Sequence, residues 1–132
     1  MAVSQVDNFS MPSMPPLTDD TLWAILNDEL DDDTVNRLVW CSLSYQEISD
    51  GWDSSAVEPA WAEKYPEPPN FIESRPATVQ LTRSIPPEYK QLLKEELGFK
   101  GYSIDQLIPR LTRRATMVSW LLSQRKQSMG GD

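Results

Sequence analysis

The most basic run in the chain is RLTRRATMVSWLL at residues 110–122, which places three arginines within five positions. At about 100° per residue, a helix built from this run has one aliphatic face and one face of mixed character. The aliphatic face consists of Leu111, Ala115, Val118 and Leu122. The other face consists of Arg110, Arg113, Arg114 and Met117, with Trp120 at its edge. Because arginine, methionine and tryptophan are enriched at interface cores, this second face is predicted to bind a partner.

The nature of that partner is indicated by the distribution of charge. Residues 1–74 carry a net charge of −13, residues 75–132 carry +5, and the whole chain of 132 residues carries −8. The arginines therefore have two candidate counter-charges, the acidic half of the same domain or an acidic protein. A nucleic-acid-binding helix is an alternative, but the overall negative charge opposes the attraction that dominates nucleic-acid affinity. We therefore expect a protein partner, with nucleic acid as the second hypothesis.

Groups suited to catalysis are scarce in this sequence. The chain has no histidine, which excludes the usual general base and both the Ser-His-Asp and Cys-His arrangements. Cys41 is the only cysteine, so an internal disulfide and a cysteine-based metal cluster are excluded. The glycine-containing loop GFKGYS lacks the spacing of a phosphate-binding loop. We predict no catalytic residue and no cofactor, and an enzyme without histidine chemistry is the third hypothesis.

A metal site is the functional interpretation of the acidic run Asp31-Asp32-Asp33. Calcium loops, however, place their carboxylates at alternating positions around a turn glycine, and this run has consecutive carboxylates and no glycine. The run is better interpreted as a joint between two helices, with Asp33 capping the second helix. We therefore predict no metal ligands here.

Helical patterns flank this joint. Thr18 is suited to cap a helix that extends to Leu30, and apolar residues at helical spacing from Val35 to Leu43 predict a second helix. Their short connection predicts an antiparallel helical hairpin. Residues 44–57 then break the helical pattern, and the turn signal Asp50-Gly51 favours a short β-hairpin or an ordered loop.

Residues 58–76 combine five prolines with three aromatic residues, Trp61, Tyr65 and Phe71. A helical turn is expected at Pro59 and an extended chain after Tyr65. The segment is either a proline-rich ligand for another protein or a strap anchored in the domain's own core, and its aromatic content favours the core. From Ala77 to Thr82 the pattern allows a helix or a short strand.

The last third of the chain contains two further helical patterns. Pro86 and Pro87 open a helix that should end at Gly98. Ser103 is then suited to cap the last helix, which would extend the buried stripe back to Ile104 and Leu107. Pro109 either kinks that helix or separates residues 103–108 from it.

These patterns together predict a mainly α fold, a compact single-domain bundle of about four to five short helices with one irregular proline- and aromatic-rich segment and at most one short β-hairpin. The expected limits are a disordered tail at 1–16, one helical domain at 17–126 and a second disordered tail at 127–132. Apolar runs are too short for membrane insertion, and the N-terminus fits neither a secretory signal nor a transit peptide. A cytoplasmic location is therefore expected, and the oligomeric state stays open.

Three runs of the sequence resemble a known family. They are TLWAILNDELDDDTVNRLVW, KYPEPPNFIESRPATVQLTRSIPPEYKQLLKEELGFKGY and TRRATMVSWLL. Together they resemble a small family of cyanobacterial and plastid proteins known only as a domain of unknown function, over roughly Thr18 to Ser123. The segment CSLSYQEISDGWDSS departs from that family, in which a tyrosine-rich turn stands at this place. The resemblance implies a photosynthetic source and a cytosolic or stromal location, and it implies no activity, cofactor or site residue.

Overall fold

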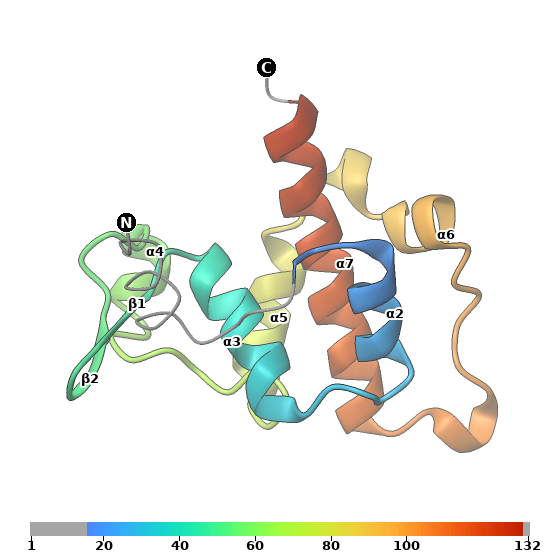
Figure 1. The fold of residues 1–132 in the computed structure, drawn as a ribbon, viewed down its shortest axis with the longest axis horizontal. Coiled ribbons are helices and arrows are strands. Elements are labelled where there is room, and N and C mark those ends of the chain that lie inside the picture. Colours follow the sequence, from blue (N-terminus) through green and yellow to red (C-terminus); the bar gives the residue numbers. More distant parts are fainter. Residues whose placement is uncertain (1–15, 131–132) are drawn as a thin grey trace, which may run out of the picture.

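Helices dominate the computed structural model, which describes residues 16–130 of the chain and the side chains up to residue 127 (Figure 1). Its elements, in chain order, are α2 (Asp19–Leu26), α3 (Asp32–Ser42), β1 (Gln46–Ile48), β2 (Gly51–Asp53), α4 (Pro59–Ala62), α5 (Arg75–Arg83), the 3-10 turn η1 (Pro87–Tyr89), α6 (Leu92–Leu97), the 3-10 turn η2 (Ile104–Gln106) and α7 (Pro109–Gly130). The predicted mainly α fold with one small hairpin is confirmed. The predicted N-terminal tail lies almost entirely outside the described residues, and α7 continues to Gly130.

Helix α7 is the centre of the fold. Helices α2, α3, α5 and α6 all pack directly against it, with α2 and α6 on one side in Figure 1 and α3 and α5 on the other. Its residues Val118, Leu121 and Leu122 are fully buried. No helix in the described part of the chain is long and apolar enough to cross a membrane.

The start of α2 follows the sequence expectation. The Thr18 hydroxyl accepts a hydrogen bond from the amide of Thr21 at 3.3 Å, and two aspartates occupy the positive end of the helix dipole. The predicted hairpin of α2 and α3 is wrong, because each helix packs mainly on α7 and not on the other. The predicted cap by Asp33 is also wrong. Helix α3 begins at Asp32, and Asp33 lies in its first turn, where it pairs with Arg37 at 2.9 Å.

The β-hairpin is confirmed, with β1 and β2 antiparallel and Ile48 opposite Gly51. At its base, Trp40 and Trp52 meet edge to face with their ring centroids 5.2 Å apart. Tyr45 is buried, and its hydroxyl donates to the carbonyl of Tyr65 at 2.6 Å. These contacts attach the hairpin to the segment that follows it.

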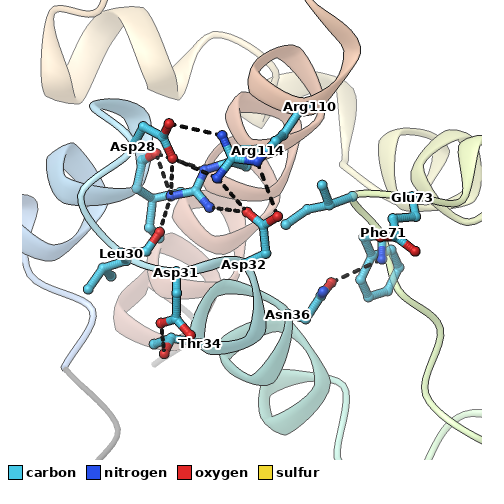
Figure 2. Close-up of polar contacts among 12 residues, drawn as sticks. Asp28, Leu30, Asp31, Asp32, Thr34, Asn36, Phe71, Glu73, Arg110 and Arg114 are labelled. Carbon is cyan, nitrogen blue, oxygen red and sulfur yellow. Dashed lines mark hydrogen bonds and ion pairs between the residues drawn. The ribbon is translucent and has the colours of Figure 1, made fainter.

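The proline- and aromatic-rich segment packs in the core, as the sequence favoured. Trp61 on α4 and Phe71 are buried and in edge-to-face contact at 5.8 Å. The side chain of Asn36, on α3, accepts from the amide of Phe71 at 3.0 Å, which fixes this irregular stretch to a helix (Figure 2). Residues 75–83 then form helix α5, not a strand. The Ser74 hydroxyl caps this helix by accepting a hydrogen bond from the amide of Ala77 at 3.3 Å.

The segment predicted as one helix before Gly98 is divided into η1 and α6. Gln91 leaves the helical conformation between them, with φ −104° and ψ 9°. Gly98 ends α6 in the left-handed conformation, with φ 70°, as expected for a helix-terminating glycine. Leu92 and Leu97 carry the buried contacts of this helix.

Residues 99–108 form an arch that leads from α6 to the start of α7 (Figure 1). Its tyrosine, Tyr102, anchors it by donating to the carbonyl of Leu26 at 2.8 Å. Ser103 caps η2 and not α7, which instead begins at Pro109, a residue suited to the first helical position. Because the helical period starts only there, Ile104 and Leu107 are exposed and the prediction that they extend the buried stripe is wrong.

Candidate interaction surface on helices α5 and α7

The exposed face predicted for the last helix is not present as a surface. Arg114 and Met117 have no exposed area and Trp120 retains 2%. The helical wheel assumed that one face packs and the other meets solvent, whereas four helices surround α7. The predicted exposure of these three residues is therefore wrong. Their burial does not bear on whether another part of α7 binds a partner.

Arg114 is bound inside the domain by the joint between α2 and α3. Its guanidinium donates to Asp32 at 2.7 Å, to the carbonyl of Leu30 at 2.6 Å and to the carbonyl of Ile25 at 3.2 Å. The carbonyl of Ile25 lies in the last turn of α2 and also accepts from the amide of Asp28 at 3.2 Å, whereas Leu30 lies in the joint that follows this helix. A buried cation thus satisfies a carboxylate and two carbonyls at once.

Arg110 completes the same cluster at the surface. Its guanidinium lies 2.8 Å from Asp28 and 2.9 Å from Asp32, and Figure 2 shows both arginines directed at these two carboxylates. The hydrogen bond from Arg110 holds the pKa of Asp28 below its ordinary value, while the same carboxylates raise the pKa of Arg110. Of the two counter-charges that the sequence offered, Arg110 and Arg114 use the protein's own acidic half.

Arg113 differs from its two neighbours. It is half-buried and donates to the carbonyl of Ile72 at 2.9 Å. Among the residues that the structure describes, no carboxylate lies within 4.0 Å of Arg113 or of the exposed Arg75 on α5. Arg113 is therefore the one residue of the predicted set that combines partial exposure with no acidic partner among the described side chains.

These two arginines line a groove of about 360 Å³ between α5 and α7. Its remaining lining consists of Thr78, Val79, Thr82, Leu107, Pro109 and Thr112. All three threonine hydroxyls donate to main-chain carbonyls of nearby residues. Their donors are thus engaged within the protein, so the guanidinium groups are the main source of donors for a ligand in this groove.

An apolar ledge adjoins the groove at Leu107. It consists of Ile104, Leu107 and Ile108, with 88%, 57% and 47% of their surface exposed. Adjacent exposed aliphatic side chains of this kind mark interaction sites more often than isolated ones do. The helical spacing of the sequence did not predict the ledge, because it places Ile104 and Leu107 in the core. Pro109, directly after Ile108, was the signal that the stripe stops there.

Catalytic and metal-binding groups do not assemble around this groove. Cys41, on α3, is exposed at the surface, and desolvation raises the pKa of its thiol, which disfavours the reactive thiolate. In residues 16–127, no three acidic or cysteine side chains come together in a way that would hold a metal ion.

Comparison with known proteins places the chain in a family. The family described as "Domain of unknown function (DUF1823)" matches residues 16–126. A solved structure described as "Solution NMR structure of the protein" is 57% identical, with 90% of this chain and 99% of that chain covered and a TM-score of 0.75. A search of curated proteins gave no match. Because the family match covers nearly all of the residues that the structure describes, the chain belongs to the family of the domain of unknown function DUF1823.

Proposed function

We propose that this protein is a non-catalytic protein-binding module, an adaptor, assembly factor or accessory subunit, and that it binds its partner through the α5–α7 groove and the adjoining ledge. The observation that carries the proposal is that two arginines lie beside three exposed aliphatic side chains. These arginines, Arg75 and Arg113, have no carboxylate within 4.0 Å among the described residues. Arginine beside exposed apolar surface is characteristic of protein interfaces. The groove thus replaces the outer face of α7 as the candidate surface.

The expected occupant is an acidic segment of a protein with apolar side chains among its carboxylates. Two guanidinium groups on the groove complement carboxylates, since arginine binds them in bidentate geometry. The ledge complements aliphatic or aromatic residues on the same segment. The net charge of −8 on the whole chain would repel a wrongly oriented acidic partner and thereby favour docking at this position.

Nucleic acid is disfavoured as the occupant by the use of arginines inside the fold. Arg110 and Arg114 are already paired with Asp28 and Asp32, so the C-terminal helix offers few cations to a phosphate backbone. Strong non-specific binding typically rests on about six to ten phosphate contacts. The resemblance noted in the sequence supports a photosynthetic cell as the setting, with the partner in the cytosol or the plastid stroma.

A peptide selection tests the groove directly. A library of random twelve-residue peptides would be selected on the wild-type protein and scored against the double variant Arg75→Glu, Leu107→Asp. The matched control is Lys90→Glu, Ile48→Asp, which makes the same changes of charge and polarity at exposed positions away from the groove. Selected peptides should be rich in aspartate, glutamate and large apolar residues. They should lose at least tenfold in affinity for the groove variant and keep it for the control.

Two results would overturn the proposal. One is a set of selected peptides that bind the groove variant and the control variant equally well. The other is enrichment of basic peptides, which would show that the acidic half of the molecule is the surface that attracts partners.

A further inference from the structure

The two arginines of the α5–α7 groove lie at the same end of it. Arg75 is the first residue of α5, and its exposed side chain shares one face of that helix with the other α5 residues that line the groove. Arg113 reaches this end from α7, because its guanidinium donates to the carbonyl of Ile72, three positions before Arg75. Two positive charges from separate helices are therefore gathered at the start of α5.

These two charges are not balanced by the protein around them. Among the described residues no carboxylate lies within 4.0 Å of either guanidinium, and Glu73, the acidic residue nearest to Arg75 in sequence, pairs with neither. Arg110 and Arg114, on the same helix as Arg113, are by contrast paired with aspartates. Arg113 gives one of its five N–H donors to a carbonyl. This end of the groove therefore offers a ligand positive charge that no described carboxylate neutralises.

The number of guanidinium groups indicates the kind of anion that fits. A carboxylate carries one negative charge, and a single arginine binds both of its oxygens in bidentate geometry. A phosphate monoester carries about 1.5 to 2 negative charges near neutral pH and has three acceptor oxygens, which is enough to bind two guanidinium groups at once. Two neighbouring arginines without a carboxylate thus complement a phosphate group better than a carboxylate.

The apolar ledge indicates that the phosphate belongs to a polypeptide. Leu107 lines the groove together with the two arginines, and Ile104 and Ile108 continue the exposed apolar surface beyond it. A free phosphorylated metabolite would leave this surface in water, whereas a peptide segment presents a phosphorylated side chain and an apolar neighbour together. The groove volume of about 360 Å³ is at the lower end of the range for ligand pockets, which suits one modified side chain and its flanking residues.

We propose that the partner segment bound in this groove carries a phosphorylated serine or threonine. Its phosphate contacts Arg75 and Arg113, and an adjacent apolar residue contacts Leu107. Binding of phosphorylated residues by clustered arginines is a recurring mode of peptide recognition. The inference rests on the proposed function and specifies the chemistry of the partner: phosphorylation of the segment turns its binding on.

A degenerate peptide library supplies the ligand for the test. Peptides of about eleven residues, with phosphoserine fixed at the centre and all other positions degenerate, would be captured on the immobilised full-length protein and sequenced. The best-retained sequence would then be synthesised with phosphoserine, glutamate or serine at the centre, and fluorescence anisotropy would give the dissociation constant of each form. The phosphorylated form should bind at least about tenfold more tightly than the glutamate form, with an apolar residue close to the phosphoserine.

A pair of arginine variants locates the phosphate. Arg75→Gln should weaken binding of the phosphorylated peptide about tenfold, because it removes one of two guanidinium groups, and binding of the glutamate form by no more than about threefold. Arg83→Gln is the matched control, since it removes an exposed arginine of the same helix that does not line the groove. It should change either affinity by less than about twofold.

Different results would overturn the inference alone or the proposed function with it. Equal affinity for the phosphoserine and glutamate forms, with both weakened by Arg75→Gln, would leave the groove as a surface for acidic segments and remove only the phosphate. A library that the wild-type protein does not retain, although it binds unphosphorylated acidic peptides in the groove, would do the same. Competition by free phosphoserine as strong as by the peptide would assign the groove to phosphorylated small molecules. Phosphopeptides that bind Arg75→Gln and Leu107→Asp as tightly as wild type would remove the groove itself.

Discussion

At the residue scale, the acidic run at 31–33 and the basic run at 110–114 explain each other. Asp32 contacts both Arg110 and Arg114, and Asp28 joins them from the end of α2 (Figure 2). The sequence showed that the two halves carry opposite charge, but it could not show which charges meet, because these pairs are separated by about 80 positions along the chain. Local spacing rules do not reach that far.

Replacing Arg114 by methionine should destabilise the domain. The change leaves the Leu30 carbonyl without its donor, removes the guanidinium from the Ile25 carbonyl and leaves Asp32 without its buried partner. Because Asp32 is 40% exposed and can regain water, we expect a loss of about 2–4 kcal/mol in the free energy of unfolding. Urea unfolding measures it, with Arg83→Met at an exposed position of α5 as the control, expected within about 0.5 kcal/mol of wild type. Equal stability of the two variants would show that the buried cluster contributes nothing.

The cluster should also make stability depend on pH. The folded-state pKa of Asp28 is below its ordinary value, because Arg110 binds the ionised form. Its stabilising contribution is therefore complete above the unfolded-state pKa of about 3.9 and is lost as pH falls through the lower folded-state pKa. Between about pH 5 and pH 2, the free energy of unfolding should fall more steeply for the wild type than for Asp28→Asn. Asp50→Asn is the control, and the same slope in wild type and Asp28→Asn would contradict the assignment.

At the element scale, some signals that act within one turn were reliable, although the caps predicted at Asp33 and Ser103 were wrong, and signals that depend on packing were not reliable. Thr18 and Gly98 mark helix ends as predicted, because caps and left-handed turns are local chemistry. The β-hairpin followed from Asp50-Gly51 in the same way. The burial of α7 on several sides could not be predicted, because periodicity shows that one face packs but not how many neighbours a helix has.

Gly98 offers a test of one such local signal. Its φ of 70° is unfavourable for residues with a Cβ, although a Cβ built there meets no atom within 4 Å. Gly98→Ala should therefore lower the free energy of unfolding by about 1 kcal/mol through backbone strain alone, and Gly98→Asn should cost less. Thermal unfolding of both variants checks the order. A larger loss for asparagine than for alanine would point to a side-chain clash as the cause.

At the scale of the whole molecule, function depends on what the fold leaves exposed. The candidate set from the sequence contained five residues, of which three are buried and Arg110 is paired with aspartates. Only Arg113 is both partly exposed and without an acidic partner among the described residues, as predicted for the whole set. The structure adds Arg75 and the ledge that adjoins the groove. Arg75 lies on another helix, and the ledge depends on an irregular arch, so neither follows from the pattern of the last helix.

The ledge should contribute to binding but not to folding. Ile104→Asp with Leu107→Asp removes apolar surface that is already mostly exposed. We expect the free energy of unfolding to change by less than about 1 kcal/mol and self-association, if any, to decrease. Urea unfolding and sedimentation measure the two effects. A loss of several kcal/mol would show that the arch is held in place by these side chains.

The most direct test of the groove as the partner surface is to locate the contact itself. A photo-crosslinking amino acid would replace Leu107 beside the groove or, as the matched control, Ile48 on the distant hairpin, which is 50% exposed. Both proteins would be irradiated in an extract of the cells that produce the protein, and the crosslinked peptides would be sequenced by mass spectrometry. The groove predicts a defined acidic segment, with flanking apolar residues, attached at position 107 and absent at position 48. The same products at both positions, or products at position 48 alone, would contradict it.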